Sequence, residues 1–343
     1  MAVNDNNEIH VGLTGPVRSG KTNLFVDFAK CVELNFHGFQ QLQNIKIETD
    51  RVNRKLLRTY YRNLPEATES VTDIRFDLEL DLPAETGLAS ADGLQKRQFN
   101  IHVRDAPGEA AFPSEDVPGK TNPHAEKAKE LDEWFSKAKG IVLVISALNA
   151  GTDEGFEALI DKVEDFFERA GKPEFENLER VVIAVSMFDL LLLRFGNRSR
   201  DIATEPEAVL AILHAHMRPA FDIIKDFRPF PSQQRDIDLR FIATSSYGFH
   251  PQLGCANIDA NAEILDPGNS RFPVPLTPDN VRYPYMTADP FIFAALGLDS
   301  PFLFTRDEIL SGILKDRNPA GIAFQPATAV APEPAETADE TSA

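Results

Sequence analysis

The stretch "HVGLTGPVRSGKTNLF", residues 10–25, decides what fold we expect. Within it, Gly15 to Thr22 follow the pattern G-x-x-x-x-G-K-[ST], between an apolar run and an amphipathic one. The two glycines permit backbone torsions and close approaches that a side chain would block. Successive N–H groups then point into one concavity at the positive end of a helix, which suits an anionic phosphate. The sequence predicts a strand over 9–15, a phosphate-binding loop and a helix over 21–35.

Each residue of this loop has an expected role. Lys21 would reach the β- and γ-phosphate oxygens of a nucleotide, and the Thr22 hydroxyl would ligate Mg²⁺. The expected nucleotide-binding residues are Gly15, Pro16, Val17, Arg18, Ser19, Gly20, Lys21, Thr22 and Asn23. The alternative is a chance match in a loop, and the strand and helix on either side argue against it.

Apolar, β-branched runs alternate with amphipathic stretches along the rest of the chain. We expect strands at 72–80, 98–107, 140–148, 180–188 and 238–246, and helices at 124–138, 153–170 and 205–226. Two of these strands are continuously apolar, as in the centre of a parallel sheet that is covered on both faces. The alternation predicts a doubly wound α/β sheet.

A second motif lies in "HVRDAPGEAAF", residues 102–112. Asp105 ends a predicted strand and would act on Mg²⁺ through the water shell of the metal. The N–H of Gly108 would bond a γ-phosphate, so that the loop senses its loss. An ordinary turn after a strand is the alternative, because D-x-P-G is also common turn chemistry.

The phosphate loop followed by D-x-P-G resembles the TRAFAC class of P-loop GTPases, over about residues 8–250. The resemblance implies a three-layer P-loop NTPase sheet, mostly parallel with one antiparallel strand, and helices on both faces. It also implies a guanine-reading motif, whose place is "SMFD", residues 186–189. Asp189 would bond the guanine N1 and N2, while Met187 replaces the usual Lys and supplies only a soft apolar surface. Asp189 as a mere helix cap is the alternative.

The same resemblance implies the remaining site residues. Ser245, in "TSS", would present a backbone N–H to the base oxygen or simply end a strand. Thr68 would ligate Mg²⁺ when the γ-phosphate is present, with Ser70 and Thr72 as alternatives. Glu109 stands where a Gln or His usually orients the attacking water, so we expect slow intrinsic hydrolysis. The expected catalytic residues are Lys21, Thr68, Gly108 and Glu109, and the expected metal ligands are Thr22, Thr68 and Asp105.

Three parts of the chain differ in composition. Residues 1–250 would form a P-loop GTPase-like domain with inserts at about 36–66 and 110–140. We expect residues 41–63 of the first insert to be helical, and the stripe of Leu131, Trp134 and Phe135 in the second to pack in the core. Residues 251–317 would form an irregular and helical extension packed on the core. Residues 318–343 are rich in Pro, Ala, Glu and Thr and would be disordered.

Composition excludes several classes of function. The net charge of −18, without a local basic patch, disfavours nucleic acids and anionic membranes. No apolar run reaches the roughly 18 residues of a membrane span, and no secretory signal is recognisable, so we expect a cytoplasmic protein. Cys31 and Cys255 are expected to be reduced, structural thiols. No zinc site is expected, because metal-ligand spacing is lacking among His10, His102, His124, His214, His216 and His250.

Together these patterns favour a Mg²⁺-dependent switch that binds GTP and GDP and hydrolyses GTP slowly, and such an activity would make the protein a GTPase. A protein partner would read the switch loops. The stretch "PLTPDNVRYPYMTADPFIFAALG", residues 275–297, is similar to the C-terminal pattern of bacterial TRAFAC-clade GTPase-like proteins, the double-GTPases, which implies a conflict, defence or signalling system. The alternatives are a nucleotide-binding scaffold without turnover, or an ATPase or kinase of P-loop type. Whether the chain forms a homodimer across the nucleotide face is left open.

Overall fold

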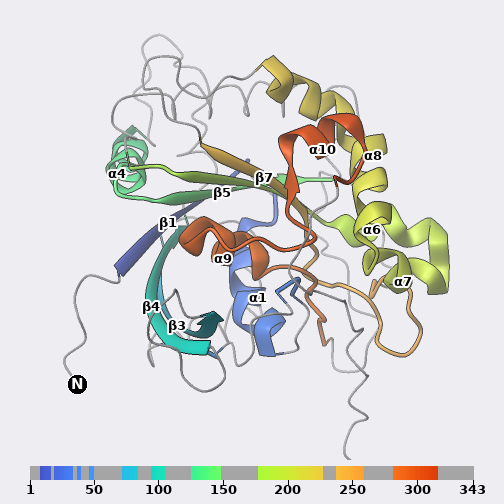
Figure 1. Ribbon diagram of the computed structural model, residues 1–343, viewed down its shortest axis with the longest axis horizontal. Helices are drawn as coiled ribbons and strands as arrows, with labels where there is room; N and C mark the ends of the chain where they lie inside the picture. Colours follow the sequence, from blue (N-terminus) through green and yellow to red (C-terminus); the bar gives the residue numbers. More distant parts are fainter. Residues whose placement is uncertain are drawn as a thin grey trace, which may run out of the picture.

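The computed structural model describes residues 8–16, 19–33, 37–39, 46–49, 72–83, 94–105, 125–147, 177–226, 237–258 and 281–315. Its centre is an eight-stranded sheet in the order β2-β3-β4-β1-β5-β6-β7-β8 (Figure 1). The strands are β1 (Glu8–Thr14), β2 (Lys46–Thr49), β3 (Thr72–Pro83), β4 (Leu94–Asp105), β5 (Gly140–Ser146), β6 (Arg180–Ser186), β7 (Asp238–Ala243) and β8 (Phe304–Thr305). The helices are α1 (Lys21–Glu33), α4 (Ala125–Phe135), α6 (Phe188–Leu192), the 3₁₀ helix η4 (Leu193–Arg198), α7 (Ser199–Ala203), α8 (Pro206–Asp226), α9 (Asp289–Leu296) and α10 (Arg306–Ser311).

The sheet is mostly parallel, as the sequence predicts. β1 pairs in parallel with β4 and β5, and β5, β6 and β7 continue in the same direction. β3 is the antiparallel strand, paired with β2 on one side and β4 on the other. β8 adds a second, two-residue antiparallel strand at the far edge. Every residue of β5 is buried, which explains the continuous apolar runs in the central strands.

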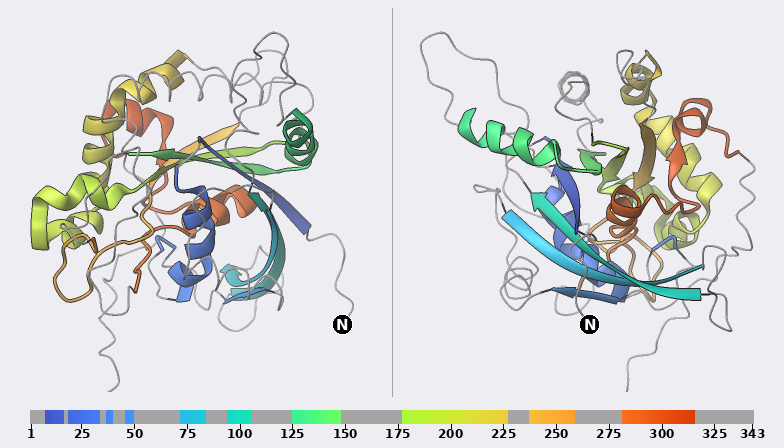
Figure 2. Two further views of the ribbon diagram at one scale, coloured as in Figure 1. Left: turned by 180° about the vertical axis from the view of Figure 1, so that it is seen from behind. Right: turned by 60° about the vertical axis from the view of Figure 1, so that its left-hand side comes forward.

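Helices cover both faces of this sheet, which confirms the three-layer α/β fold. On one face, Phe28 of α1 packs edge-on against Phe76 of β3 and also contacts Phe291 of α9. On the other face, Trp134 of α4 packs edge-on against His10 of β1. The apolar stripe of α4 is buried, as expected. Figure 1 shows α1 and α9 below β5 and α8 above and to its right, and the left view of Figure 2 shows the same arrangement from behind.

The strand order creates a switch point between β1 and β5. From β1 the chain moves toward β2, β3 and β4 on one side, whereas from β5 it moves toward β6 and β7 on the other. Ligands of open α/β sheets bind outside the carboxyl ends of the strands at such a point. The loop that follows β1 lies at this end.

Two expectations about secondary structure are wrong. Residues 46–49, expected within a helical insert, form β2, whose backbone pairs with β3 from Lys46↔Glu79 to Thr49↔Phe76. The sheet therefore overrides local helix propensity at this position. β3 and β4 are also longer than expected, because their antiparallel ladder continues to the pair Pro83↔Leu94. The helix expected at 153–170 and the tail at 318–343 lie outside the described residues.

The C-terminal elements are built into the core. Residues 289–295 of α9 are all buried, and α9 lies against β1, β5 and β6. Its carboxyl end is satisfied by Arg180 of β6, whose Nε and Nη2 donate to the carbonyls of Ala294 and Ala295 at 3.1 and 3.2 Å. α10 begins with a capping box, in which Thr305 and Glu308 each bond the backbone N–H of the other. None of the helices in the described ranges is long and apolar enough to cross a membrane.

Candidate functional site

The described residues between β1 and α1, which are 15, 16, 19 and 20, lie at the carboxyl end of β1. The Ser19 N–H donates to the Pro16 carbonyl at 3.2 Å, and Leu24 donates to Gly20 at 2.9 Å, which starts α1. A Cβ on Gly15 would lie 2.2 Å from the carbonyl oxygen of Val144 in β5, so only glycine fits there. Gly20 has a φ of +86°, which residues with side chains rarely adopt. Both glycines of the sequence motif are therefore required by the backbone.

Lys21 is the first residue of α1, and its side chain turns back over the loop. Its Nζ donates to the carbonyl oxygens of Gly15 and Pro16 at 2.8 and 2.9 Å. The side chain is only 5% exposed, which is rare for lysine. The ammonium therefore adds a full positive charge to the positive end of a 13-residue helix. Thr22 and Asn23 follow in the first turn of α1, and both are partly exposed.

The end of β6 touches this loop directly. The Ser186 hydroxyl donates to the Ser19 carbonyl at 2.6 Å. The next residue, Met187, has a left-handed φ of +59°, and its sulfur accepts a 3.5 Å hydrogen bond from the Ser146 hydroxyl. This turn directs the chain from β6 into α6. The expected phosphate-binding and base-reading segments are thus in contact, although they lie far apart in the sequence.

Asp189 lies in the first turn of α6 and is 1% exposed. Burial raises the pKa of this carboxyl from 3.8 to about 7, although hydrogen bonds from Ser245 and from the backbone of residues 189 and 190 oppose the shift. The N-cap of α6 is Met187, so Asp189 is not the capping residue, although its carboxylate bonds backbone groups of residues 189 and 190 within the first turn. Its Oδ2 atom, however, has no hydrogen-bond partner among the described residues. A buried acceptor in this state favours a ligand that donates hydrogen bonds.

Ser245 supports Asp189 from the loop after β7. Its hydroxyl accepts a 2.8 Å bond from the Gly248 N–H and contacts the Asp189 carboxylate. Its own backbone N–H donates to the Tyr285 carbonyl at 3.0 Å, and Tyr285 donates back at 2.7 Å. That backbone N–H is therefore engaged by the C-terminal segment. Ser245 orients the carboxylate through its side chain.

A buried ion pair beside the site escaped sequence reasoning. Nη1 of Arg282 donates to Oδ2 of Asp27 in α1 at 3.2 Å, and Nη2 lies 3.1 Å from Oδ1. Ser246, next to Ser245, also bonds the Asp27 carboxylate. The Thr287 hydroxyl donates to the Asp27 carbonyl at 3.1 Å. The pair joins residues 255 positions apart, and no local sequence pattern could have revealed it.

Several predicted site residues lie outside the described part of the chain. These are Val17, Arg18, Thr68, Gly108 and Glu109. Asp105 is the last residue of β4, where its backbone is in register with Leu13 of β1. Its position therefore lies at the same end of the sheet as the phosphate loop. The roles of these residues remain predictions.

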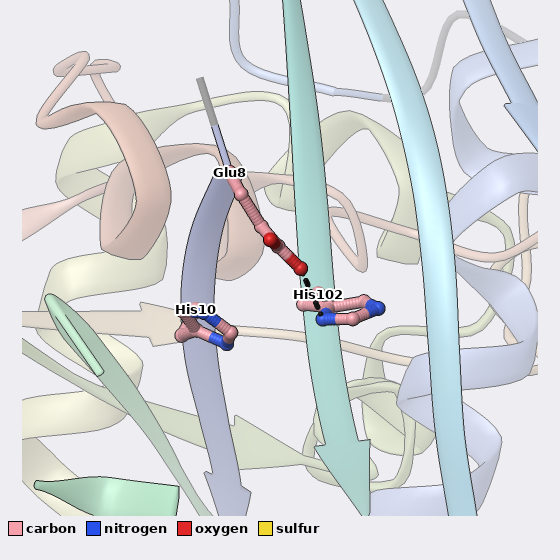
Figure 3. Close-up of side chains that lie close together, drawn as sticks. All are labelled: Glu8, His10 and His102. Atoms are coloured by element: carbon pink, nitrogen blue, oxygen red, sulfur yellow. Dashed lines mark ion pairs between the residues drawn. The ribbon is translucent and has the colours of Figure 1, made fainter. Parts of the chain in front are cut away.

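A second polar cluster lies on the α4 face, toward the other end of β1. Figure 3 shows Glu8 and His10 of β1 beside His102 of β4. Nδ1 of His102 lies 2.9 Å from Oε1 of Glu8, and the two imidazole centroids are 5.5 Å apart. One ligand atom from each residue lies within 4.8 Å of the others. His10 and His102 lie far apart in the sequence, so residue spacing did not show that β1 and β4 bring them together. The signal available was Glu8 and His10 two positions apart, on one face of a strand.

Comparisons with known proteins add little to this geometry. No protein-family model matches the chain, and no curated protein matches its sequence. Among solved structures, the chain is similar to a bacterial selenocysteine-specific elongation factor, EF-Sec, with 12% sequence identity and a TM-score of 0.30. That match covers 69% of this chain and 25% of the elongation factor, so this chain spans about a quarter of that protein.

Proposed function

We propose that the protein is a Mg²⁺-dependent guanine-nucleotide switch that hydrolyses GTP slowly. One observation carries the proposal. A glycine-constrained loop with a buried lysine lies in hydrogen-bond contact with a turn that leads to a buried carboxylate. The 2.6 Å bond from Ser186 to Ser19 fixes the distance between the two halves. A nucleotide has the matching groups, an anionic phosphate chain and a base.

The phosphates would bind over the loop of residues 15–20. Its N–H groups, the amino end of α1 and the Lys21 ammonium would together hold the negative charge. Lys21 already lies over the loop, bonded to two neutral carbonyl oxygens. Thr22 in the next position would ligate Mg²⁺, with Thr68 and Asp105 as the further proposed ligands. Loss of the γ-phosphate would be sensed through Gly108, and Glu109 would orient the attacking water.

The base would bind at Asp189. Guanine presents two neighbouring donors, N1–H and N2–H, whereas adenine presents an acceptor at N1. A carboxylate with an oxygen that lacks a partner therefore favours guanine. The Ser245 hydroxyl would keep the carboxylate in place. Met187 offers an apolar thioether without an ammonium, so we expect a weaker guanine preference than a lysine at that position would give.

The first experiment is a titration of the purified protein with fluorescent GDP, GTP and ATP, with and without Mg²⁺. Lys21→Ala is expected to weaken binding of all three nucleotides by at least tenfold, because a buried charge-assisted contact is lost. Lys30→Ala, with the same change of charge on the same helix, serves as the control. Equal affinity of wild type and Lys21→Ala would refute the phosphate site.

Asp189→Ala tests the base site separately. We expect it to remove any preference for GTP over ATP while phosphate-dependent binding persists. Asp201→Ala, an exposed aspartate in α7, controls for the loss of one negative charge. A preference that survives Asp189→Ala would mean that another residue reads the base.

Phosphate release from the same samples separates the switch from a second candidate, a scaffold that holds GTP without turnover. The features that favour the scaffold are Met187, in place of the usual base-contacting Lys, and Glu109, in place of the Gln or His that usually orients the attacking water. Slow release that depends on Mg²⁺ would support the switch. Tight binding without release would support the scaffold, and equal or better binding of ATP would favour an ATPase or kinase.

A further inference from the structure

We propose that Glu8, His10 and His102 bind a divalent transition-metal ion such as Zn²⁺ between β1 and β4 (Figure 3). Two imidazoles and one carboxylate form a ligand set that suits zinc and its neighbours rather than Mg²⁺ or Ca²⁺. Three protein ligands leave one position of a tetrahedral ion for water.

The two strands hold the ligands in a fixed arrangement. His10 and His102 are direct partners in the parallel ladder, and Glu8 lies two positions before His10 on the same face. His102 is 7% exposed, while Glu8 at the start of the strand keeps a side chain that is 45% exposed. The site thus combines one anchored ligand with one that is free to adjust from the solvent side.

Only a small adjustment is needed to bind an ion. Ligand atoms around tetrahedral zinc lie about 3.3 Å apart, as follows from metal–nitrogen distances of about 2.0–2.1 Å. Here the three ligand atoms already lie within 4.8 Å of one another. The remaining contraction of about 1.5 Å is within the reach of side-chain rotations at Glu8 and His10.

Neighbouring side chains cover the cluster and influence its affinity for a metal ion. Trp134 of α4 packs edge-on against His10, with the ring centroids 4.7 Å apart, and lies 5.6 Å from the His102 ring. The Arg104 guanidinium stacks over the same indole at 4.3 Å. The positive charge of Arg104 repels a metal cation at the cluster, so we expect the metal to bind more weakly than at a closed site with four protein ligands.

The cluster is separate from the proposed nucleotide site. His10 precedes Gly15 by five residues, which corresponds to about 16 Å along a strand. The ion would therefore not be the Mg²⁺ of a nucleotide, and the inference stands independently of the proposed function. Its role would be to join the two strands whose opposite ends carry the phosphate loop and Asp105.

Trp134 provides a direct readout, because it is the only tryptophan in the chain. Untagged, nucleotide-free full-length protein, freed of metal with a chelator, would be titrated with Co²⁺. We expect saturable quenching of Trp134 fluorescence at one equivalent. Zn²⁺ should reverse the quenching by displacing Co²⁺, whereas a hundredfold excess of Mg²⁺ should not. Calorimetry with Zn²⁺ alone should give the same stoichiometry.

Variants then assign the ligands. His10→Gln and Glu8→Gln should each weaken Zn²⁺ binding by at least tenfold, and His216→Gln, at an exposed position on α8, should not. Glu8→Gln keeps the shape of an exposed side chain, so it remains a valid test if His10→Gln does not fold. Absence of saturable binding would overturn the proposal. So would binding that survives Glu8→Gln unchanged, or that Mg²⁺ abolishes.

Discussion

Replacing Arg282 by methionine should destabilise the protein strongly, because it breaks a buried ion pair. The Asp27 side chain is 0% exposed and that of Arg282 is 4% exposed. Removing one partner of such a pair typically costs about 3–5 kcal/mol, since the other charge stays buried without compensation. We therefore expect Arg282→Met to lower the free energy of unfolding by about that amount at pH 8, as measured by urea denaturation of the nucleotide-free protein.

The pH dependence of this loss provides a second test. Burial raises the pKa of Asp27 to about 6 from 3.8, while the Arg282 charge pulls it down. A folded pKa above the unfolded one means that the folded state holds the proton more tightly. The contribution of the Asp27 carboxyl to the free energy of unfolding therefore falls as the pH rises from about 4 to about 6. Without Arg282 the pKa rises further, so the variant should be closer to wild type at pH 5 than at pH 8.

Two controls make the result decisive. Lys315→Met breaks an exposed ion pair with Asp307 and should cost less than about 1 kcal/mol. The double variant Asp27→Leu/Arg282→Met removes both charges and should recover much of the loss, because no charge is left buried. If Arg282→Met costs no more than Lys315→Met, or if its cost is the same at pH 5 and pH 8, the ion pair does not contribute as argued.

Three further outcomes are expected. The pKa of Asp189 is about 7, and guanine would bond its ionised form, so GTP affinity should rise about tenfold from pH 6 to pH 8 in fluorescence titrations. Asp189→Asn should remove this pH dependence of GTP affinity. Gly15→Ala should abolish nucleotide binding and lower the melting temperature, because its Cβ would meet the Val144 carbonyl at 2.2 Å; unchanged binding would contradict the loop geometry. Gly140→Ala places a Cβ 2.1 Å from the Ala294 carbonyl oxygen, so calorimetry should show a melting temperature several degrees lower than that of the wild type. An unchanged melting temperature would mean that α9 packs differently against β5.

The central sheet could be predicted from sequence because its signal is local. Continuous apolar runs marked β5 and β6, which were expected at 140–148 and 180–188 and are found at 140–146 and 180–186. β8 has only two residues and exists through its pairing with β7, so no periodicity could reveal it. The error at residues 46–49 has the same cause, since β2 is defined by its partner β3.

The candidate site likewise has parts that a local sequence motif predicts and parts that only the tertiary structure reveals. The phosphate loop is a continuous motif, so its glycines and Lys21 could be assigned from spacing alone. Asp189 could be proposed as a site residue because it follows a strongly apolar run, but its raised pKa depends on burial, which the sequence does not display. The Asp27–Arg282 pair and the cluster of Glu8, His10 and His102 arise from tertiary contacts between distant segments.

The packing of α9 against β1, β5 and β6 has a consequence for synthesis on the ribosome. Strands β1, β5 and β6 emerge long before residues 289–296, which cover one of their faces. Until then, the backbone beside Gly140 and the apolar surface of α1 lack their final neighbours. The nascent chain therefore carries an apolar face without its covering helix from the synthesis of β6 until that of α9. A chain truncated after residue 258 would keep this face exposed, which favours aggregation. The synthesis of α9 thus sets the stage of translation at which this apolar face of the sheet becomes covered.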